Sequence, residues 1–550
     1  MSQSSAFRPW RACSKRAIAV LLAASACVYL GYHLAISLDS DDTNHLETPL
    51  ALALARQVEE GPTHLYGPFC AGRPTVLIHA PLYYRLAGLG AWFLAALRIN
   101  PVVAALASGR LLSFLAFLAA LTAAAWLARI DGAPAWAGIS SALLIAASPV
   151  VGSFPVTVRP DTLGLCLQTL GAALVLRVWL NRKSSTKPLV GAYVAFGLAF
   201  CVKQHDVVTA LASSALLGAA CVRREIQARS VFIGMAAGLV TVLAYYGTEE
   251  IAGGGLVFRS VFEVPAELRR VDPGSWRHVA DVSVEVGKMS VGLLALAAAG
   301  LWAARGYLPR SRLDRALGFF LAAELAAMLA LCLNSAGAWT NYAMQAVVFA
   351  AVLMGRSIER LGRSAAAWRR LIPLSLAAGL LFAADVRLVW ISGRARASDR
   401  MALQAIFADP HIGASAPGEL YFVGAPQHNR RFGRLDLAHD EWLYTAFEAL
   451  GAAEPREHWL RSALVTGTVR HVIAPRNCLD IPGLAEPIPA LGYDLVGDFD
   501  RYLVWERHDS VVAWRARRRR LSSVLPPTEV QGSSLNTSDD RVTRTSATPP

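Results

Sequence analysis

Charged residues are scarce in this sequence. Of its 550 residues, only 17% are Asp, Glu, Lys or Arg, whereas 54% are hydrophobic. Apolar runs long enough to cross a bilayer, which takes about 20 residues, recur between Ala17 and Trp390. A soluble protein could not bury so much apolar length. The composition therefore excludes a soluble globular protein and predicts a polytopic helical membrane protein.

Cysteine pairs of the kind that bind metal are missing. None of the eight cysteines belongs to a CxxC pair or to a Cys/His group with zinc-ligand spacing. Most lie inside apolar runs, where cysteine acts as a small hydrophobic residue. Only Cys70 and Cys478 fall in segments expected outside the membrane, and a disulfide between them is left open.

Acidic residues are fewer than basic ones, 40 against 53, which gives a formal net charge of +13. A charge of that size can indicate nucleic-acid binding, but here the basic residues gather in short loops between apolar runs. Lys and Arg concentrate in cytoplasmic loops because they resist translocation and attract anionic lipids. The four groups are Arg182, Lys183 and Lys187; Arg223, Arg224 and Arg229; Arg305, Arg310, Arg312 and Arg315; and Arg356, Arg360, Arg363, Arg369 and Arg370. The charge therefore indicates topology, and we expect no nucleic-acid partner.

Placing those loops on the cytoplasmic side requires about eleven spans. Residues 1–16 are basic and cytoplasmic, and the apolar run that follows is too long for a signal peptide, so we expect an uncleaved first span. The predicted spans are 17–38, 103–128, 134–154, 161–180, 188–203, 206–222, 230–247, 288–304, 316–333, 340–358 and 371–391. The apolar stretch Pro81–Leu97 is short and carries Arg85, so we expect a helix at the outer membrane interface.

The multi-span domain is thus expected to cover 17–391, with outer loops at 39–102 and 248–287. Residues 392–513 contain short β-like runs and are predicted to form a small extracytoplasmic α/β domain. Those runs are 418–424, 469–475 and 493–507. The tail, 514–550, is rich in Ser, Thr and Pro and is predicted to be disordered. The fold class is an all-α polytopic membrane protein with this small C-terminal domain.

The densest acidic cluster of the chain stands at the exit of the first span. It contains Asp39, Asp41, Asp42 and Glu47. One interpretation is a charged flank, followed by a helix with Thr48 as its N-cap and a stop at Gly61-Pro62. That interpretation accounts for the cap and leaves Asp41 and Asp42 unexplained.

Four further polar segments are predicted on the same side of the membrane. A carboxylate base beside cations suits chemistry on a lipid-linked phosphate, because the base deprotonates an acceptor hydroxyl while Arg or Lys neutralises the phosphate leaving group. The segments are His79-Ala80-Pro81-Leu82-Tyr83-Tyr84, Arg159-Pro160-Asp161, Lys203-Gln204-His205-Asp206 and Gly337-Ala338-Trp339-Thr340-Asn341-Tyr342.

In this order and on this common side, the segments resemble glycosyltransferases of the C superfamily. The resemblance is to the bacterial, family 39-like relatives of protein O-mannosyltransferases and aminoarabinose transferases, and it covers Ala17 to Trp390. It implies an inverting enzyme of the inner (plasma) membrane, with a cytoplasmic N-terminus and an extracytoplasmic C-terminal domain. A sugar would pass from a polyprenyl-phosphate donor to a lipid, glycan or protein of the cell envelope.

The resemblance also implies roles for single residues. Asp41 is the expected base, with Asp42 as its neighbour, although Thr43, Asn44 and His45 stand where the family has aromatic residues. His79 matches a family His, and Ala80 replaces a Pro of the family motif. Arg159 and Lys203 would face the phosphate. The full predicted substrate-binding set is His79, Tyr83, Arg159, Asp161, Lys203, Gln204, His205, Asn341 and Tyr342.

Each of these residues also has a purely structural interpretation. Arg159 could snorkel at a helix end, and Asn341-Tyr342 could be an ordinary turn. A polar quartet such as 203–206 in an apolar hairpin is costly unless it faces a cavity, which favours function. No cofactor is required, but His45, His64 and His79 with the Asp pair could bind a divalent metal. Two other functions stay open: a transporter or lipid flippase, and a non-catalytic envelope assembly protein with the same fold.

Overall fold

The computed structural model describes most of the helical domain and part of the C-terminal region. The described residues are 16–31 except 18 and 29, 47–61, 65–66, 77–361 except 153, 156, 183–184, 272, 294–310 and 336–337, 401–416, 419–423, 462–465, 468–476, 487–499 and 501–508. Asp41 and Asp42 lie outside them, as do His45, His64, Cys70 and Cys478, the predicted span 371–391, most of 288–304, and the predicted tail.

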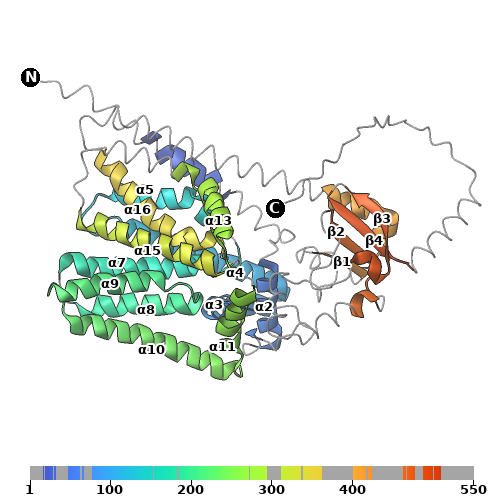
Figure 1. The fold of residues 1–550 in the computed structure, drawn as a ribbon, viewed down its shortest axis with the longest axis horizontal. Coiled ribbons are helices and arrows are strands. Elements are labelled where there is room, and N and C mark those ends of the chain that lie inside the picture. The colour runs from blue at the N-terminus through green and yellow to red at the C-terminus, as the bar shows by residue number, and fades with distance from the viewer. Residues whose placement is uncertain are drawn as a thin grey trace, which may run out of the picture.

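Helices make up the larger body of the molecule, and a small sheet follows near the C-terminus (Figure 1). The predicted fold class is therefore confirmed. The helical elements are α2 (Glu47–Glu60), α3 (Leu82–Ala96), α4 (Pro101–Leu127), α5 (Ala135–Ala147), α6 (Pro149–Gly152), α7 (Asp161–Asn181), α8 (Thr186–Val202), α9 (Val208–Val222), α10 (Ala228–Ala252), α11 (Leu256–Phe258), η2 (Arg259–Glu263), α12 (Val264–Val271), α13 (Trp276–Met289), α15 (Arg312–Asn334), η3 (Thr340–Ala343), α16 (Met344–Leu361), α18 (Pro410–Gly413) and η7 (Ile488–Leu491).

Among the described residues, four helices are long and apolar enough to cross a membrane: α4, α7, α10 and α15. They match the predicted spans 103–128, 161–180, 230–247 and 316–333. The predicted spans 188–203 and 206–222 correspond to the shorter apolar helices α8 and α9. The predicted span 134–154 is divided into α5 and α6, because Pro149 interrupts the helix after Ser148.

Local sequence explains where these helices begin. Asn100 caps α4 by accepting hydrogen bonds from two backbone N–H groups, and Pro101 occupies the first helical position. Ser311 and Asp314 form a capping box at the start of α15. The helix predicted after Thr48 begins at Glu47 instead, so Thr48 lies within the first turn of α2. That helix ends before Gly61, whose φ of 102° favours glycine.

Glycine lets α8 and α10 pack closely. A Cβ atom added to Gly238 would lie 2.6 Å from the backbone oxygen of Tyr193, and one added to Gly197 would lie 2.7 Å from the oxygen of Gly238. Small residues are the usual means of close helix packing in membranes, where burial of apolar surface gives little drive.

Ion pairs join the loops that were predicted to be cytoplasmic. Glu225, between α9 and α10, lies 2.6 Å from Arg312 and 3.9 Å from Arg182. Arg356 of α16 reaches Asp131, in the loop after α4, with a nitrogen–oxygen distance of 2.5 Å. These loops therefore share one end of the bundle, as the alternating topology requires.

Helix α3 is the stretch expected at the membrane interface. Tyr83, Tyr84 and Ala87 are buried, whereas Leu89 and Trp92 are 67% and 63% exposed. One face thus packs on the protein and the other presents apolar side chains outward, which suits a helix lying in the bilayer surface. Arg85, whose charge disfavours a membrane span, forms an ion pair with Glu249 of α10, with 2.7 Å between Nη2 and Oε2.

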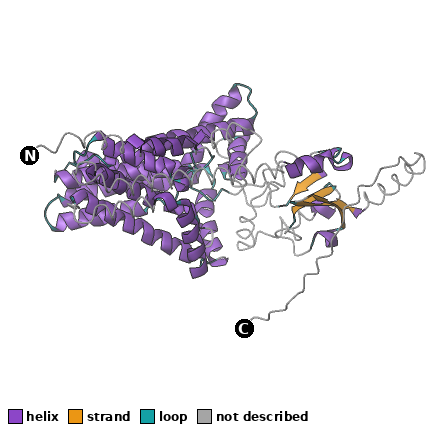
Figure 2. Cartoon of the chain, turned by 90° about the horizontal axis from the view of Figure 1, so that it is seen from above, coloured by secondary structure: helices purple, strands orange, loops and turns teal. Residues whose placement is uncertain are grey.

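The C-terminal sheet contains β1 (Leu420–Phe422), β2 (His471–Pro475), β3 (Tyr493–Phe499) and β4 (Tyr502–Arg507) in the order β1-β2-β4-β3. β1 and β2 are parallel, and the other pairs are antiparallel. The β-like run at 493–507 is a hairpin of two strands rather than one strand. The sheet lies beyond the end of the bundle that carries α2 and α3 (Figure 1), and the second view also places the strands beyond one end of the helices (Figure 2).

Candidate active site

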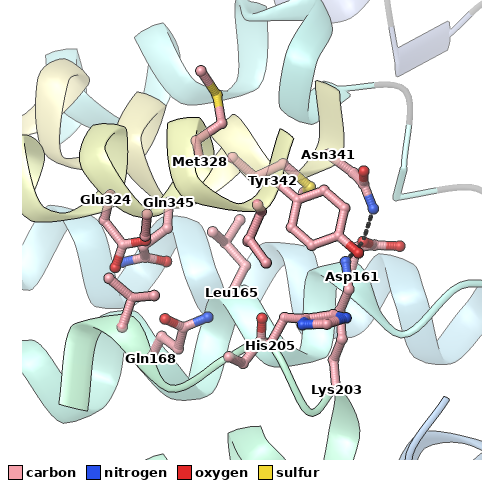
Figure 3. Close-up of a pocket in the computed structure, with 15 residues that line it drawn as sticks. Asp161, Leu165, Gln168, Lys203, His205, Glu324, Met328, Asn341, Tyr342 and Gln345 are labelled. Atoms are coloured by element: carbon pink, nitrogen blue, oxygen red, sulfur yellow. Dashed lines mark hydrogen bonds and ion pairs between the residues drawn. The ribbon is translucent and has the colours of Figure 1, made fainter. Parts of the chain in front are cut away.

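Asp161 is the centre of a buried ionic cluster at the end of the bundle opposite the basic loops. It is the first residue of α7, directly after Arg159-Pro160. Its Oδ1 accepts hydrogen bonds from Lys203 Nζ at 2.7 Å and from Asn341 Nδ2 at 2.9 Å. Arg159 Nε lies 3.1 Å from its other oxygen, Oδ2. Three separate segments of the chain thus converge on one carboxylate (Figure 3).

The cluster carries an excess of positive charge. Arg159 and Lys203 contribute two cations, and Asp161 contributes one anion. Burial raises the pKa of the neighbouring Asp206 carboxyl to about 8, so Asp206 is mainly protonated at neutral pH and the sum is one positive charge. The side chains of Arg159, Lys203 and Asp161 are 17%, 5% and 2% exposed, respectively. Burial lowers the pKa of Lys203, but the adjacent Asp161 carboxylate outweighs it and the pKa is raised, so the ammonium group stays charged. A buried excess charge of this kind favours an anionic ligand.

Two rings border the ammonium group. Lys203 Nζ lies 4.4 Å from the centroid of the Tyr342 ring, a cation–π distance. The His205 ring meets Tyr342 edge-on, with 5.4 Å between centroids. Burial, and then the charge of Lys203, lower the pKa of His205 to about 3, so this ring is neutral at physiological pH.

Several buried polar atoms near the cluster have no hydrogen-bond partner in the described part of the chain. They are His79 Nδ1, Tyr84 Oη, Arg159 Nε, Asp161 Oδ2 and Gln204 Oε1. Arg159 and Asp161 are close enough for an ion pair but are not aligned for a hydrogen bond. Burying such atoms unpaired costs about 1–3 kcal/mol each, so a polar group placed among them would be favoured.

The His79 ring belongs to this group. The ring lies nearly parallel to the Tyr84 ring, with 6.5 Å between centroids. The backbone oxygen of His79 accepts a hydrogen bond from the Tyr66 hydroxyl at 2.7 Å. Burial, followed by the charges of Lys203 and Arg159, lowers the pKa of His79 to about 3. His79 therefore faces the same cations as a neutral ring.

A polar cavity extends from the ionic cluster into the bundle (Figure 3). Its empty space, including the part open to the outside, is about 480 Å³. Amide and carboxyl side chains line it: Asp161, Gln168, Asp206, Glu324, Asn341 and Gln345. Two of these side chains, Gln168 and Glu324, lie within hydrogen-bond distance of the Thr209 hydroxyl, at 2.7 and 2.5 Å.

Comparison with known proteins identifies the architecture. Residues 87–246 match the family described as dolichyl-phosphate-mannose-protein mannosyltransferase. The whole chain is similar to the crystal structure of ArnT from Cupriavidus metallidurans bound to undecaprenyl phosphate, with a TM-score of 0.56 and 14% identity over 88% of this chain and 97% of that one. This chain therefore shares the fold of ArnT.

Two further comparisons complete the findings. ArnT from Cupriavidus metallidurans in the apo state gives a TM-score of 0.53 at 14% identity, over 87% of this chain and 96% of that one. An oligosaccharyltransferase from Archaeoglobus fulgidus in the apo form gives a TM-score of 0.45 at 11% identity, over 83% of this chain and 69% of that one. No curated protein matches the sequence significantly. The fold implied by the motif resemblance is thus confirmed by the two ArnT structures.

Within this fold, most of the predicted residues come together. Arg159, Asp161, Lys203 and Asn341 are in direct contact, and Tyr342 lies against Lys203. The remaining predicted residues, His79, Tyr83, Gln204 and His205, lie in the segments around this contact.

Tyr83 and Gln204 differ from the others because their side chains are already engaged. The Tyr83 hydroxyl lies 2.8 Å from both the Gly109 oxygen and Ser113 Oγ of α4. In the same segment, it is the neighbouring Tyr84 whose hydroxyl has no partner among the described residues. Gln204 Nε2 donates to the oxygens of Ile78 and Val261, which ties three loops together.

Sequence reasoning missed the polar wall of the cavity. Asp161, Leu165 and Gln168 recur at helical spacing on one face of α7, a pattern that could have identified Gln168. Glu324 stands alone near the middle of α15, and a lone acidic residue in an apolar helix is itself an indication of function. Asp206 was noted as part of a polar quartet but was not assigned to the site.

Glu47, the last acidic residue of the cluster after the first span, has a structural role. It is 2% exposed and pairs with Arg110 of α4 at 2.7 Å. Its Oε1 also accepts a hydrogen bond from the backbone N–H of Val158 at 2.9 Å. The chain that follows Asp41 and Asp42 is therefore anchored one residue away from Arg159.

Proposed function

We propose that this chain is an integral membrane glycosyltransferase that moves a sugar from a polyprenyl-phosphate donor to a hydroxyl group of a cell-envelope acceptor on the extracytoplasmic face. The observation that carries the proposal is the buried excess positive charge made by Arg159, Asp161 and Lys203. The phosphodiester of such a donor carries one negative charge, which this excess would balance. ArnT, which has the same fold, was crystallised with undecaprenyl phosphate.

The two cations would do more for the transition state than for the bound donor. When the acceptor oxygen attacks the anomeric carbon, the bond from that carbon to the phosphate oxygen breaks. The leaving polyprenyl phosphate then gains a second negative charge. Arg159 and Lys203 would stabilise this developing charge, which is the condition for catalysis by electrostatic complementarity.

Asp41 is proposed as the base that takes the proton of the acceptor hydroxyl, with Asp42 beside it. The anchor at Glu47 supports this assignment. Asp41 precedes Glu47 by six positions, and a chain advances at most about 3.6 Å per position, so Asp41 lies within about 22 Å of the anchor beside Arg159. The length of this segment therefore allows Asp41 to lie beside the cations.

The polar cavity is proposed to take the sugar of the donor. Carboxyl and amide groups such as Gln168, Asn341 and Glu324 suit the many hydroxyls of a sugar, and the Tyr342 ring offers a face on which a sugar ring can pack. His79 and Tyr84 would then contact the phosphate or the acceptor from the other side of the ionic cluster.

A transporter of lipid or solute is the second candidate, and one observation favours it. Glu324 is 6% exposed and lies near the middle of α15, which is where transporters keep ionisable residues. The same cavity nevertheless includes Asp161 and Lys203 of the ionic cluster in its lining. A transporter would move labelled lipid across proteoliposomes without cleaving the sugar from it, whereas the transferase releases polyprenyl phosphate.

The charge argument predicts a pattern across three variants. Lys203→Met leaves Arg159 and Asp161 with no net charge and should reduce kcat/KM for the polyprenyl-phosphate sugar by tenfold or more, since a charged hydrogen bond contributes about 1.5–3 kcal/mol. Adding Asp161→Asn restores one positive charge and should recover part of that loss. Asp161→Asn alone leaves Arg159 and Lys203 without their shared counter-ion, so it should lower the folded fraction, but the folded protein should bind the donor no more weakly than the wild type. The measurement is radiolabelled sugar transfer in proteoliposomes, with the folded fraction determined by size-exclusion chromatography.

Lys288→Ala is the matched control, because that lysine is 67% exposed and pairs only with Glu285 in the described structure. It should transfer sugar at the wild-type rate. If Lys203→Met is fully active, or if the double variant is no better than Lys203→Met in folded protein, the cations do not bind the donor phosphate.

A further inference from the structure

A second cluster of ligand-type side chains lies in the C-terminal domain. His411 comes from α18, His471 is the first residue of β2, and Glu506 lies on β4. His471 and Glu506 are directly paired across the two antiparallel strands, so their side chains share one face of the sheet. One ligand atom from each of the three residues lies within 4.8 Å of the others.

The burial of this cluster is unusual for its charge. The side chains of His471 and Glu506 are completely buried, and that of His411 is 18% exposed. A carboxylate taken fully out of water needs strong partners, because its desolvation costs several kcal/mol. His411 Nε2 lies 2.8 Å from both carboxylate oxygens of Glu506. Arg470 Nε donates a hydrogen bond to Oε1 of Glu506 at 3.2 Å.

His471 is left incompletely satisfied by these contacts. Its Nδ1 lies 3.0 Å from Ser415 Oγ. Its Nε2 has no hydrogen-bond partner in the described structure, although it points toward Glu506, with 3.6 Å to Oε1. In the tautomer in which Nδ1 donates to Ser415, Nε2 presents its lone pair to the Glu506 carboxylate, and a cation between the two would remove that repulsion.

The spacing fits a divalent metal of the zinc type. With Zn–N and Zn–O bonds of about 2.1 Å in a tetrahedron, two ligand atoms are separated by about 3.4 Å. The distances from Glu506 to the two histidines are 2.8 and 3.6 Å, on either side of that value. The hydroxyl of Ser415 on Nδ1 is the type of outer contact that orients a histidine ligand and leaves Nε2 for the metal.

We propose that His411, His471 and Glu506 form a zinc site that ties α18 to strands β2 and β4. Two neutral imidazoles and one carboxylate leave a fourth position open to water. The site is separate from the Asp161 cluster and does not depend on the proposed transferase activity.

Arg470 is the competing cation. Its Nη2 lies 3.4 Å from both ring nitrogens of His411, and its side chain is 32% exposed. In an ordinary ion-pair network, Arg470 would be the stabilising partner of Glu506. In a zinc site, it would move outward into solvent when the metal enters.

The test is zinc binding by the full-length protein in nanodiscs. After incubation with zinc and desalting, elemental analysis should find one zinc per chain, and cobalt(II) in its place should give the visible absorption of a tetrahedral site. His411→Ala and Glu506→Gln should each abolish this binding, and Ser415→Ala should weaken it by about 10–100-fold. Arg470→Gln should bind zinc at least as tightly as the wild type.

His508→Gln is the control in the same domain, because His508 is 65% exposed and pairs with Asp494. It should retain the full zinc content and the cobalt spectrum. If the wild type holds no zinc, or if its zinc survives both His411→Ala and Glu506→Gln, the site does not exist. Since the wild-type cobalt spectrum is itself a readout, misfolding of one variant does not prevent a decision.

Discussion

At the scale of single residues, the candidate active site depends on Asp161. Without this carboxylate, Arg159 and Lys203 would bring two like charges together in a buried place, and their repulsion would be severe. With the Asp161 carboxylate between them, Arg159 and Lys203 are held close together, and one positive charge remains uncompensated. The same residue that makes the cluster stable therefore sets its charge.

His205 gives this site a pH dependence. Its pKa is about 3 in the folded protein, below the ordinary value of about 6.5. Because the pKa of His205 is lower in the folded state, its contribution to the free energy of unfolding is fully present above pH 6.5. That contribution is lost as the pH falls from 6.5 toward 3. For one such group the loss is about 1.4 kcal/mol per pH unit below 6.5.

We therefore expect His205→Asn to lose less thermal stability than the wild type between pH 7.5 and pH 5, in the same detergent. His79 has a similar depression and remains in the variant, so part of the acid sensitivity should persist. Equal acid sensitivity of the two proteins would mean that His205 can be protonated in the folded state.

At the scale of elements, hydropathy located the helices, but packing decided the polar contacts. The spans that became α4, α7, α10 and α15 were visible as long apolar runs, because a bilayer requires that length. The sequence predicts a single β-like run at 493–507, although Asp500-Arg501 interrupts its β-like residues between what are strands β3 and β4. Glu324 and Gln168 meet only through Thr209 of a third helix, which no local pattern contains.

The contact between α8 and α10 offers a test of this packing. Gly238→Ala would place its Cβ atom 2.6 Å from the Tyr193 oxygen, so the two backbones must separate. Overpacking of this kind costs about 1–3 kcal/mol, and the thermal midpoint should fall.

Gly218→Ala in α9 is the matched control, because nothing lies within 4 Å of its added Cβ atom. Alanine is the better helix former by about 1 kcal/mol, so this variant should be as stable as the wild type or more so. A Gly238→Ala protein that unfolds at the same temperature as Gly218→Ala would show that α8 and α10 are not closely packed.

At the scale of the whole molecule, the two ends of the bundle have different chemistry. One end joins basic loops through Glu225 and Arg356, and the other carries the Asp161 cluster and the polar cavity. The loops that the span count assigned to one side of the membrane lie together at one end of the helical bundle. Charge patterning could therefore predict which residues share a side, because loop charge is a direct consequence of membrane insertion.

The identity of the base lies beyond that pattern. Asp39, Asp41 and Asp42 have the same chemistry and differ only in their distance from the first span. Nothing in the sequence alone orients their side chains. Their assignment rests on the superfamily resemblance and on the anchor that Glu47 provides beside Arg159.

The most direct test of the account is sugar transfer in proteoliposomes by Asp39→Asn, Asp41→Asn and Asp42→Asn variants. The donor would be a radiolabelled sugar on polyprenyl phosphate, and envelope extracts would supply the acceptor. Asparagine keeps the size of the side chain but cannot take a proton, so the Asp41 variant should lose about 10²–10⁴-fold in rate while folding normally. Asp42→Asn should lose less, and Asp39→Asn least. Small and equal losses in all three folded variants, or no transfer by the wild type with any envelope acceptor, would contradict the account.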